Sequence, residues 1–221
     1  DKIITVSDYL KNKSQVVIPD IPIQTVYNGI NTELFLQNFP DSELSDLRRQ
    51  LGISSDDFVI SFFGRINKNK GIKELLEAFL LLPEGVNVKL LVVGSSIFGQ
   101  TKLDVFTTEL RQLSEQESDN IVFTGYIDYS DIPRYHSISD CIVIPSVWEE
   151  PAGLTVCEAL ISGNSVITTN VGGIPEIVAG SEAIMVKNDK DIVVHLKEAL
   201  MSVYKKGNHQ PVDIRNRERG L

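Results

Sequence analysis

Short apolar runs alternate with amphipathic helical patterns along most of this chain, which leaves few folds open to it. The runs are rich in Val, Ile and Phe and mostly continuous in apolarity, as expected of strands that helices cover on both faces. They lie at residues 58–63, 88–93, 121–124, 141–144, 165–168 and 183–186. The helical patterns lie at residues 71–82, 103–115, 131–137, 154–162 and 189–205. The alternation predicts an α/β fold with a doubly wound, parallel, six-stranded Rossmann-like sheet.

The order of the strands decides where a ligand would bind. In the common order 3-2-1-4-5-6, the first and fourth strands are neighbours at the centre of the sheet. The crevice outside their carboxyl ends is then the usual ligand site. We therefore expect the loops that follow residues 58–63 and 141–144 to carry the chemistry.

Residues 31–207 are predicted to form the ligand-binding domain, with a connector before them and a polar tail after them. The connector, residues 1–30, holds a strand pattern at 3–6, a helix start at 7–11 and, at 26–30, a strand running into a turn. A short helix is expected at 46–51. The tail, residues 208–221, is polar and turn-rich. We expect a chain that begins inside a larger protein and is truncated at both ends.

The composition is that of a globular domain, with 42% hydrophobic and 23% charged residues. A net charge of −9 argues against nucleic acid as a partner, because phosphate binding needs clustered Lys and Arg. Cys141 and Cys157 are interpreted as buried thiols, which suits a reducing, cytoplasmic location and does not make a metal site. No apolar run reaches the roughly 18 residues that a membrane span needs.

The loop after the first long strand, residues 64–71 (GRINKNKG), combines cations with small residues. It opens with Gly64, and Arg65 and Lys70 stand between the strand and the next helix. A phosphate there would meet backbone N–H groups at a helix N-terminus, with positive side chains beside it. A solvated basic turn is the simpler alternative. The loop is neither a Walker A loop nor a G-x-G-x-x-G fingerprint.

The loop after the fourth strand, residues 145–153 (PSVWEEPAG), leads into a helix. Backbone N–H groups are unpaired at the first turn of a helix, here those of Gly153, Leu154 and Thr155. Together with the positive end of the helix dipole they suit an anion. Glu150 and Glu158 add two carboxylate acceptors, which suit a ligand rich in hydroxyls. Alternatively, Glu150 is solvated and Glu158 only complements the dipole.

The two loops converge on the edge of the sheet that the strand order singles out. One loop supplies cations, and the other supplies N–H groups and carboxylates. A phosphate flanked by hydroxyl-bearing groups is characteristic of a nucleotide sugar. The sequence therefore predicts a nucleotide-sugar site.

These segments resemble the C-terminal, donor-binding domain of the family-4 (group 1) glycosyltransferases, which have the GT-B fold. The likeness is carried by residues 64–71, by the E-x7-E pattern at 150–158 and by residues 170–176 (NVGGIPE). Residues 3–7 and 27–30 resemble the domain junction of that family. The resemblance implies a retaining glycosyltransferase that moves a sugar from a nucleotide-diphosphate donor, most simply UDP-linked, to a glycan or lipid-linked acceptor.

The resemblance also implies roles for the matching residues. Arg65 and Lys70 would bind the donor diphosphate and stabilise it as the leaving group, which is the work that Mg²⁺ does in other transferases. Glu150 would hold donor-sugar hydroxyls, and these three residues are the expected catalytic set. Glu158 would bind the ribose. The remaining donor contacts are expected from Gly64, Tyr126, Ile127, Gly153, Leu154 and Thr155. Neither a metal nor a cofactor is expected.

Some features depart from the family pattern. Ala152 stands where the family usually has an aromatic residue, and Trp148 is expected to pack rather than to stack on a ligand. The chain does not match the acceptor-binding N-terminal half of the family, which we expect to lie in the larger protein. We expect that half to provide the acceptor site and any contact with the inner face of the membrane, and the chain alone to be inactive or weakly active.

Other functions stay open. One alternative is a nucleotide-sugar epimerase of the same fold, which the context of the E-x7-E pattern disfavours. A second is a nicotinamide or flavin dinucleotide module, which the missing glycine-rich fingerprint disfavours. A third is a non-catalytic module that binds a nucleotide or a protein partner.

Overall fold

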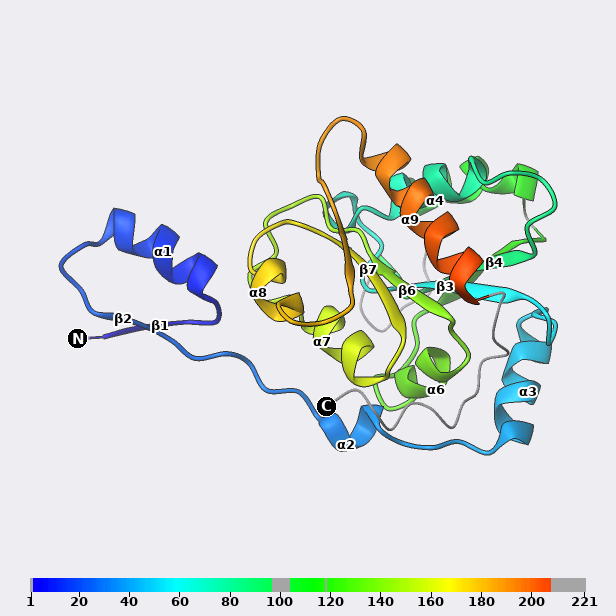
Figure 1. Ribbon diagram of the computed structural model, residues 1–221, viewed down its shortest axis with the longest axis horizontal. Helices are drawn as coiled ribbons and strands as arrows, with labels where there is room; N and C mark the ends of the chain where they lie inside the picture. The colour runs from blue at the N-terminus through cyan, green and yellow to red at the C-terminus, as the bar shows by residue number, and fades with distance from the viewer. Residues whose placement is uncertain (1, 97–103, 118, 208–221) are drawn as a thin grey trace.

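The computed structural model of the protein describes residues 2–96, 104–117 and 119–207 (Figure 1). Its strands are β1 (Ile3–Thr5), β2 (Ile23–Thr25), β3 (Phe58–Phe63), β4 (Val88–Val93), β5 (Ile121–Gly125), β6 (Cys141–Ile144), β7 (Ser165–Thr169) and β8 (Ile184–Val186). Its α-helices are α1 (Asp8–Val17), α2 (Thr32–Phe35), α3 (Asp41–Gln50), α4 (Ile72–Leu80), α5 (Val105–Leu113), α6 (Ile132–Ser137), α7 (Leu154–Ile161), α8 (Ile174–Val178) and α9 (Ile192–Gly207). Two 3-10 turns are η1 (Lys68–Lys70) and η2 (Glu115–Glu117).

Strands β3 to β8 form one six-stranded sheet in the order β5-β4-β3-β6-β7-β8. All neighbouring strands in it run parallel. β3 is bonded to β4 on one side and to β6 on the other, with Ile60 opposite Cys141. Numbered by strand within this sheet, the order is 3-2-1-4-5-6. The predicted doubly wound parallel sheet is confirmed.

Helices cover both faces of the sheet, which explains why its strands are apolar along their whole length. Ile60 and Phe62 of β3 belong to the core under α4, α5 and α9. Val59 and Phe63, which alternate with them along β3, belong to the core under α3, α7 and α8. Figure 1 shows α4 and α9 on one side of the strands and α6 and α7 on the other. Burying one such side chain contributes about 1.5–3 kcal/mol.

β1, α1 and β2 form a smaller unit, a two-stranded parallel sheet with α1 as the crossover helix. Ser7 is the N-cap of α1, and its hydroxyl accepts the Leu10 N–H at 3.2 Å. Such a cap contributes about 1 kcal/mol to the stability of a helix. In Figure 1 this unit lies at the left, beyond α8.

Two predictions for the first part of the chain were wrong in their bounds. The strand expected at 26–30 is irregular, because β1 ends at Thr5 and the next residues start α1. Only one further ladder bond forms, from Val26 N–H to the Thr5 carbonyl at 2.8 Å. The helix expected at 46–51 is α3, which begins earlier, at Asp41. Its first turn carries Asp41 and Glu43, which suit the positive end of a helix dipole.

The five-residue helix α8 was not expected, because it is too short to show a helical period. Residue 103 of the helix expected at 103–115 and the tail at 208–221 lie outside the described residues. In the described part of the chain, no helix is both long enough and apolar enough to cross a bilayer.

Candidate functional site

The two loops that were expected to carry the chemistry lie against each other. We call the carboxyl ends of β3 and β6, with residues 64–71 and 145–153, the β3–β6 edge. Val147 donates its N–H to the Asn69 carbonyl at 3.0 Å, which joins the loops. A Cβ atom at Gly71 would lie 1.8 Å from the Pro145 carbonyl oxygen. Since Gly71 also has φ of +68°, only glycine fits this crossing point.

Glycines also stand at the carboxyl ends of β3, β4 and β5. Gly94 follows β4 and donates its N–H to the carbonyl of Gly125, the last residue of β5, at 3.1 Å. A Cβ at Gly94 would lie 2.0 Å from the carbonyl oxygen of Gly64, the residue after β3. All three have positive φ. This side of the edge is therefore built from bare backbone, which a ligand can approach closely.

Lys70 and Glu150, predicted from different loops, meet directly at the β3–β6 edge. Lys70 Nζ lies 2.6 Å from Glu150 Oε2. The side chains are 21% and 16% exposed, so this pair is largely withdrawn from water. The Ser146 hydroxyl lies 3.4 Å from the same carboxylate oxygen. The alternative of a solvated Glu150 is therefore wrong.

The backbone of Glu150 is held by the loop after β7. Gly173 donates its N–H to the Glu150 carbonyl at 2.8 Å. A Cβ at Gly172 would lie 2.1 Å from that same oxygen. One residue before this loop, Thr169 donates its hydroxyl to the Ser146 carbonyl at 2.6 Å. The motif at residues 170–176 thus has a structural role that the sequence did not reveal, namely fixing the loop that carries Glu150.

The N-terminus of α7 follows Glu150 after a short turn at Pro151 and Ala152. Its N-cap is Gly153, at φ +49°, and the first helical bond runs from Val156 N–H to the Gly153 carbonyl at 2.9 Å. The N–H groups of Leu154 and Thr155 belong to the first turn, which carries partial positive charge. Arg65 is exposed on the loop after β3. In the described part of the chain, no ion pair involves Arg65, so its charge is available to an anion.

Glu158 lies one turn into α7 and is hydrogen-bonded to a residue that the sequence did not single out. The Tyr129 hydroxyl donates to Glu158 Oε1 at 2.9 Å. Burial raises the pKa of Glu158, and the bond from Tyr129 partly opposes this. Burial and the same bond raise the pKa of Tyr129 to about 12. Tyr129 lies in the loop after β5, as do Tyr126 and Ile127. Its position in the same loop as two predicted donor residues was the sequence signal that could have identified it.

Tyr126 and Ile127 come directly after Gly125, at the end of β5. Both are half-buried, and Ile127 packs on the core beneath α7. Burial, followed by the charge of Asp128, raises the pKa of Tyr126. The loop after β5 thus reaches the same end of the sheet as the β3–β6 edge.

The exposure of two residues in the β6–α7 segment, Trp148 and Cys157, differs from the prediction. Trp148 was expected to pack, but the residue is 49% exposed. Cys157 was expected to be buried and is only half-buried, whereas Cys141 is fully buried. Ala152, at the position where the family resemblance implies an aromatic side chain, is half-buried.

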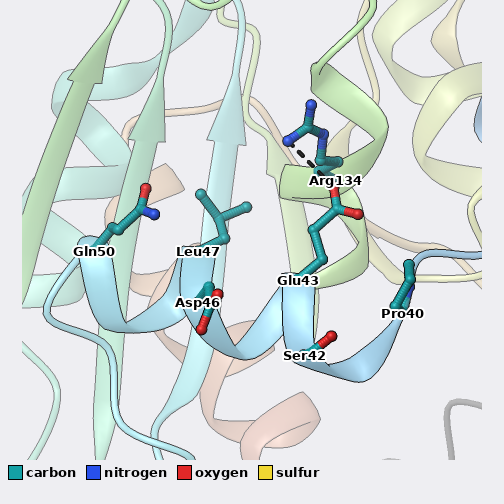
Figure 2. Close-up of a pocket in the computed structure, with 7 residues that line it drawn as sticks. All are labelled: Pro40, Ser42, Glu43, Asp46, Leu47, Gln50 and Arg134. Carbon is teal, nitrogen blue, oxygen red and sulfur yellow. Dashed lines mark ion pairs between the residues drawn. The ribbon is translucent and has the colours of Figure 1, made fainter.

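A cavity of about 400 Å³ lies elsewhere, between α3 and α6 (Figure 2). Arg134 of α6 reaches across to the Glu43 carboxylate of α3 at 3.2 Å. The lining includes none of the predicted donor residues; it consists of Pro40, Ser42, Glu43, Asp46, Leu47, Gln50 and Arg134. Among the residues that the structure describes, no cluster of three or more His, Cys, Asp or Glu could hold a metal ion.

The fold and the edge together define a doubly wound α/β domain with cations, carboxylates and a helix N-terminus gathered where β3 and β6 adjoin. The chain belongs to the glycosyl transferases group 1, because the model of that family matches residues 45–217. It is 31% identical over 186 residues to spore coat protein SA of Bacillus subtilis. That match covers 80% of this chain and 48% of the relative.

A second relative is the lipopolysaccharide 1,2-N-acetylglucosaminetransferase of Salmonella typhimurium, 30% identical over 179 residues. The match covers 80% of this chain and 46% of that enzyme. The chain therefore spans about half the length of the curated relatives that it matches.

Solved structures agree with the GT-B assignment of the fold. Anabaena HepE, crystallised with UDP-glucose, superimposes with a TM-score of 0.78 at 23% identity, covering 98% of this chain and 57% of HepE. The C-terminal domain of the group 1 glycosyltransferase LpcC from Francisella tularensis gives a TM-score of 0.64 at 25% identity. In that comparison 87% of this chain matches 100% of the other.

Proposed function

We propose that this chain is the donor-binding half of a retaining glycosyltransferase that takes a sugar from a UDP-linked donor. One observation carries the proposal. Lys70 Nζ and Glu150 Oε2 lie 2.6 Å apart, beside the N-terminus of α7. A cation, a carboxylate and free helix N–H groups in one place fit a phosphate joined to a sugar.

The diphosphate would bind between the loop after β3 and the first turn of α7. Arg65 and Lys70 supply positive charge from one side, and the N–H groups of Gly153, Leu154 and Thr155 supply hydrogen bonds from the other. As the bond from sugar to phosphate breaks, negative charge grows on the leaving diphosphate. The same groups would stabilise that charge, which is electrostatic catalysis.

The hydroxyl-bearing parts of the donor would lie on either side of the diphosphate. Glu150 would accept hydrogen bonds from the donor sugar. Glu158 would accept from the ribose, with one of its oxygens already held by Tyr129 at 2.9 Å. Backbone groups of Tyr126 and Ile127, beyond Gly125, would frame the base.

The comparisons support a nucleotide-sugar donor and a glycan or lipid-linked acceptor. HepE was crystallised with UDP-glucose, and the Salmonella relative is named for transfer to lipopolysaccharide. Since this chain spans about half of such relatives, the acceptor site is proposed to lie in a further domain. Retention means that the acceptor oxygen bonds to the anomeric carbon on the face from which the diphosphate departs.

Calorimetry on the chain with UDP, GDP and ADP tests the donor site. UDP is expected to bind, and Arg65→Ala or Lys70→Ala should each weaken binding by about 1.5–3 kcal/mol, the contribution of one charge-assisted hydrogen bond. Lys73→Ala is the matched control, because Lys73 is the second residue of α4 and is paired with Glu77 at 3.7 Å. Failure of all three nucleotides to bind would refute the proposal.

Transfer itself needs acceptor and donor held together. The assay is therefore made on the full-length protein with UDP-sugars, and the anomeric configuration of the product is read by proton NMR. An inverted product would contradict retention. An epimerised free donor would favour the epimerase instead.

A further inference from the structure

The ion pair between Lys70 and Glu150 bears on which nucleotides the site can hold. Glu150 is the partner that neutralises Lys70, at 2.6 Å, in a place where both side chains are mostly buried. Separating a buried ion pair is costly, because it leaves each charge buried without a partner. A phosphate that takes Lys70 must therefore compete with the Glu150 carboxylate.

The backbones on both sides of this pair are fixed, so only the side chains can respond. Gly71 is wedged against the Pro145 carbonyl, which holds the end of the Lys70 loop. Gly173 binds the Glu150 carbonyl at 2.8 Å, and Gly172 lies directly over it. The Glu150 carboxylate can reach bulk solvent only by rotation of its side chain. Any change in the Lys70–Glu150 pair must therefore come from rotation of these two side chains.

An intact donor and its nucleotide product differ in what they offer Glu150. A nucleotide sugar brings phosphates for Lys70 and hydroxyls for Glu150, so both charges keep a partner. A nucleoside diphosphate brings phosphates only, and Glu150 is then left beside added negative charge. Unpaired and like charges in a partly buried site disfavour that complex.

We propose that Glu150 is a specificity-determining residue that favours the sugar-bearing donor over the nucleoside diphosphate product. Once the sugar has been transferred, the Glu150 carboxylate competes for Lys70 and speeds departure of the product. This inference rests on the donor site proposed above, and it adds a role in product release to the binding of sugar hydroxyls.

The test compares UDP, UDP-glucose and inorganic pyrophosphate by calorimetry in the wild-type chain and in Glu150→Gln. The amide keeps the size of the side chain and removes its charge. UDP and pyrophosphate should bind about tenfold more tightly to the variant, the effect of removing one charged competitor. UDP-glucose should gain less or become weaker, so the preference for it over UDP should fall.

Two further variants separate this effect from a general change of charge. Glu149→Gln is the matched control, because Glu149 is adjacent in sequence but pairs with Lys13. It should leave the ratio of the two affinities unchanged. In Lys70→Met no Lys70 charge remains for Glu150 and phosphate to compete for. Adding Glu150→Gln there should tighten UDP binding by less than it does in the wild-type chain, because only the repulsion between the carboxylate and the phosphates is relieved. The double variant lacks both charges and so leaves neither of them buried without a partner. It should therefore fold even where a single variant does not.

The outcomes distinguish this inference from the proposed function. Weaker binding of both UDP and pyrophosphate to Glu150→Gln would overturn it while leaving the donor site intact. Equal tightening of UDP and UDP-glucose would overturn it as well, because Glu150 would then act only through its charge. If the wild-type chain bound none of the three probes, the donor site and this inference would fall together.

Discussion

The Glu176 carboxylate of α8 accepts the backbone N–H of Tyr9 at 2.6 Å, at the first turn of α1. It also accepts the Asp8 N–H at 2.8 Å and the Tyr27 hydroxyl at 3.1 Å. One carboxylate thus caps a helix that begins far earlier in the chain and ties the β1–α1–β2 unit to the loop behind Glu150.

Glu176→Ala is expected to loosen α1 from α8. Each charge-assisted hydrogen bond contributes about 1.5–3 kcal/mol, and the variant removes several at once. Amide hydrogen exchange in residues 8–17 should speed up by tenfold or more, on the order of one such bond. Glu182→Ala, at an exposed site nearby in the sequence, should leave those rates unchanged. Unchanged exchange in Glu176→Ala would show that Lys13 and Glu149 suffice to hold the unit.

Gly71→Ala should strongly destabilise the domain. The added Cβ would lie 1.8 Å from the Pro145 carbonyl oxygen, in a residue already at φ +68°. Gly85→Ala is the control, since Gly85 has φ +84° but open space around it. Backbone strain alone predicts a loss of about 1–2 kcal/mol for Gly85→Ala. Urea unfolding should show a clearly larger loss for Gly71→Ala, and equal losses would argue that the two loops do not cross closely.

Arg48→Met should destabilise the domain by about 3 kcal/mol, because the guanidinium group of Arg48 satisfies several carbonyls at once. It donates to the carbonyls of Asp57 at 2.6 Å, Ser54 at 2.8 Å and Ile138 at 3.1 Å. Arg49→Met is the matched control. Arg49 is 76% exposed and pairs with Asp46, so its loss should stay within about 0.5 kcal/mol. Thermal unfolding of both variants measures the difference.

UDP affinity should fall as the pH is lowered through the pKa of Glu158. Burial raises that pKa above the ordinary value of 4.5. In the proposed donor site the ribose hydroxyls bind the carboxylate form of Glu158, so protonation of this carboxylate can weaken binding by up to about tenfold per pH unit below the pKa. Calorimetry over a pH series tests this, with Glu158→Gln expected to lose that dependence.

Tyr129→Phe should shift the same profile toward higher pH. The Tyr129 hydroxyl donates to Glu158 at 2.9 Å and favours the charged form. Without this bond the pKa of Glu158 should rise further, so UDP binding should begin to weaken at a higher pH. A shift in the opposite direction would mean that the bond does not stabilise the carboxylate.

The sequence alone predicted the sheet, its strand order and both loops of the β3–β6 edge. Apolar runs such as Phe58–Phe63 and stripes such as that of α4 are local patterns, and burial on both faces follows from them. Elements without a local pattern were missed or misplaced. The short helix α8 and the irregular segment at 26–30 depend on contacts with distant partners.

The sequence by itself determined which residue types stand at the carboxyl ends of the strands, because position along a strand and loop composition are local properties. Only the tertiary structure decided which of them meet. Lys70 pairs with Glu150, Tyr129 with Glu158, and Glu176 with the start of α1. Each pair joins segments far apart in the chain, and such contacts follow from how the loops pack rather than from any period in the sequence.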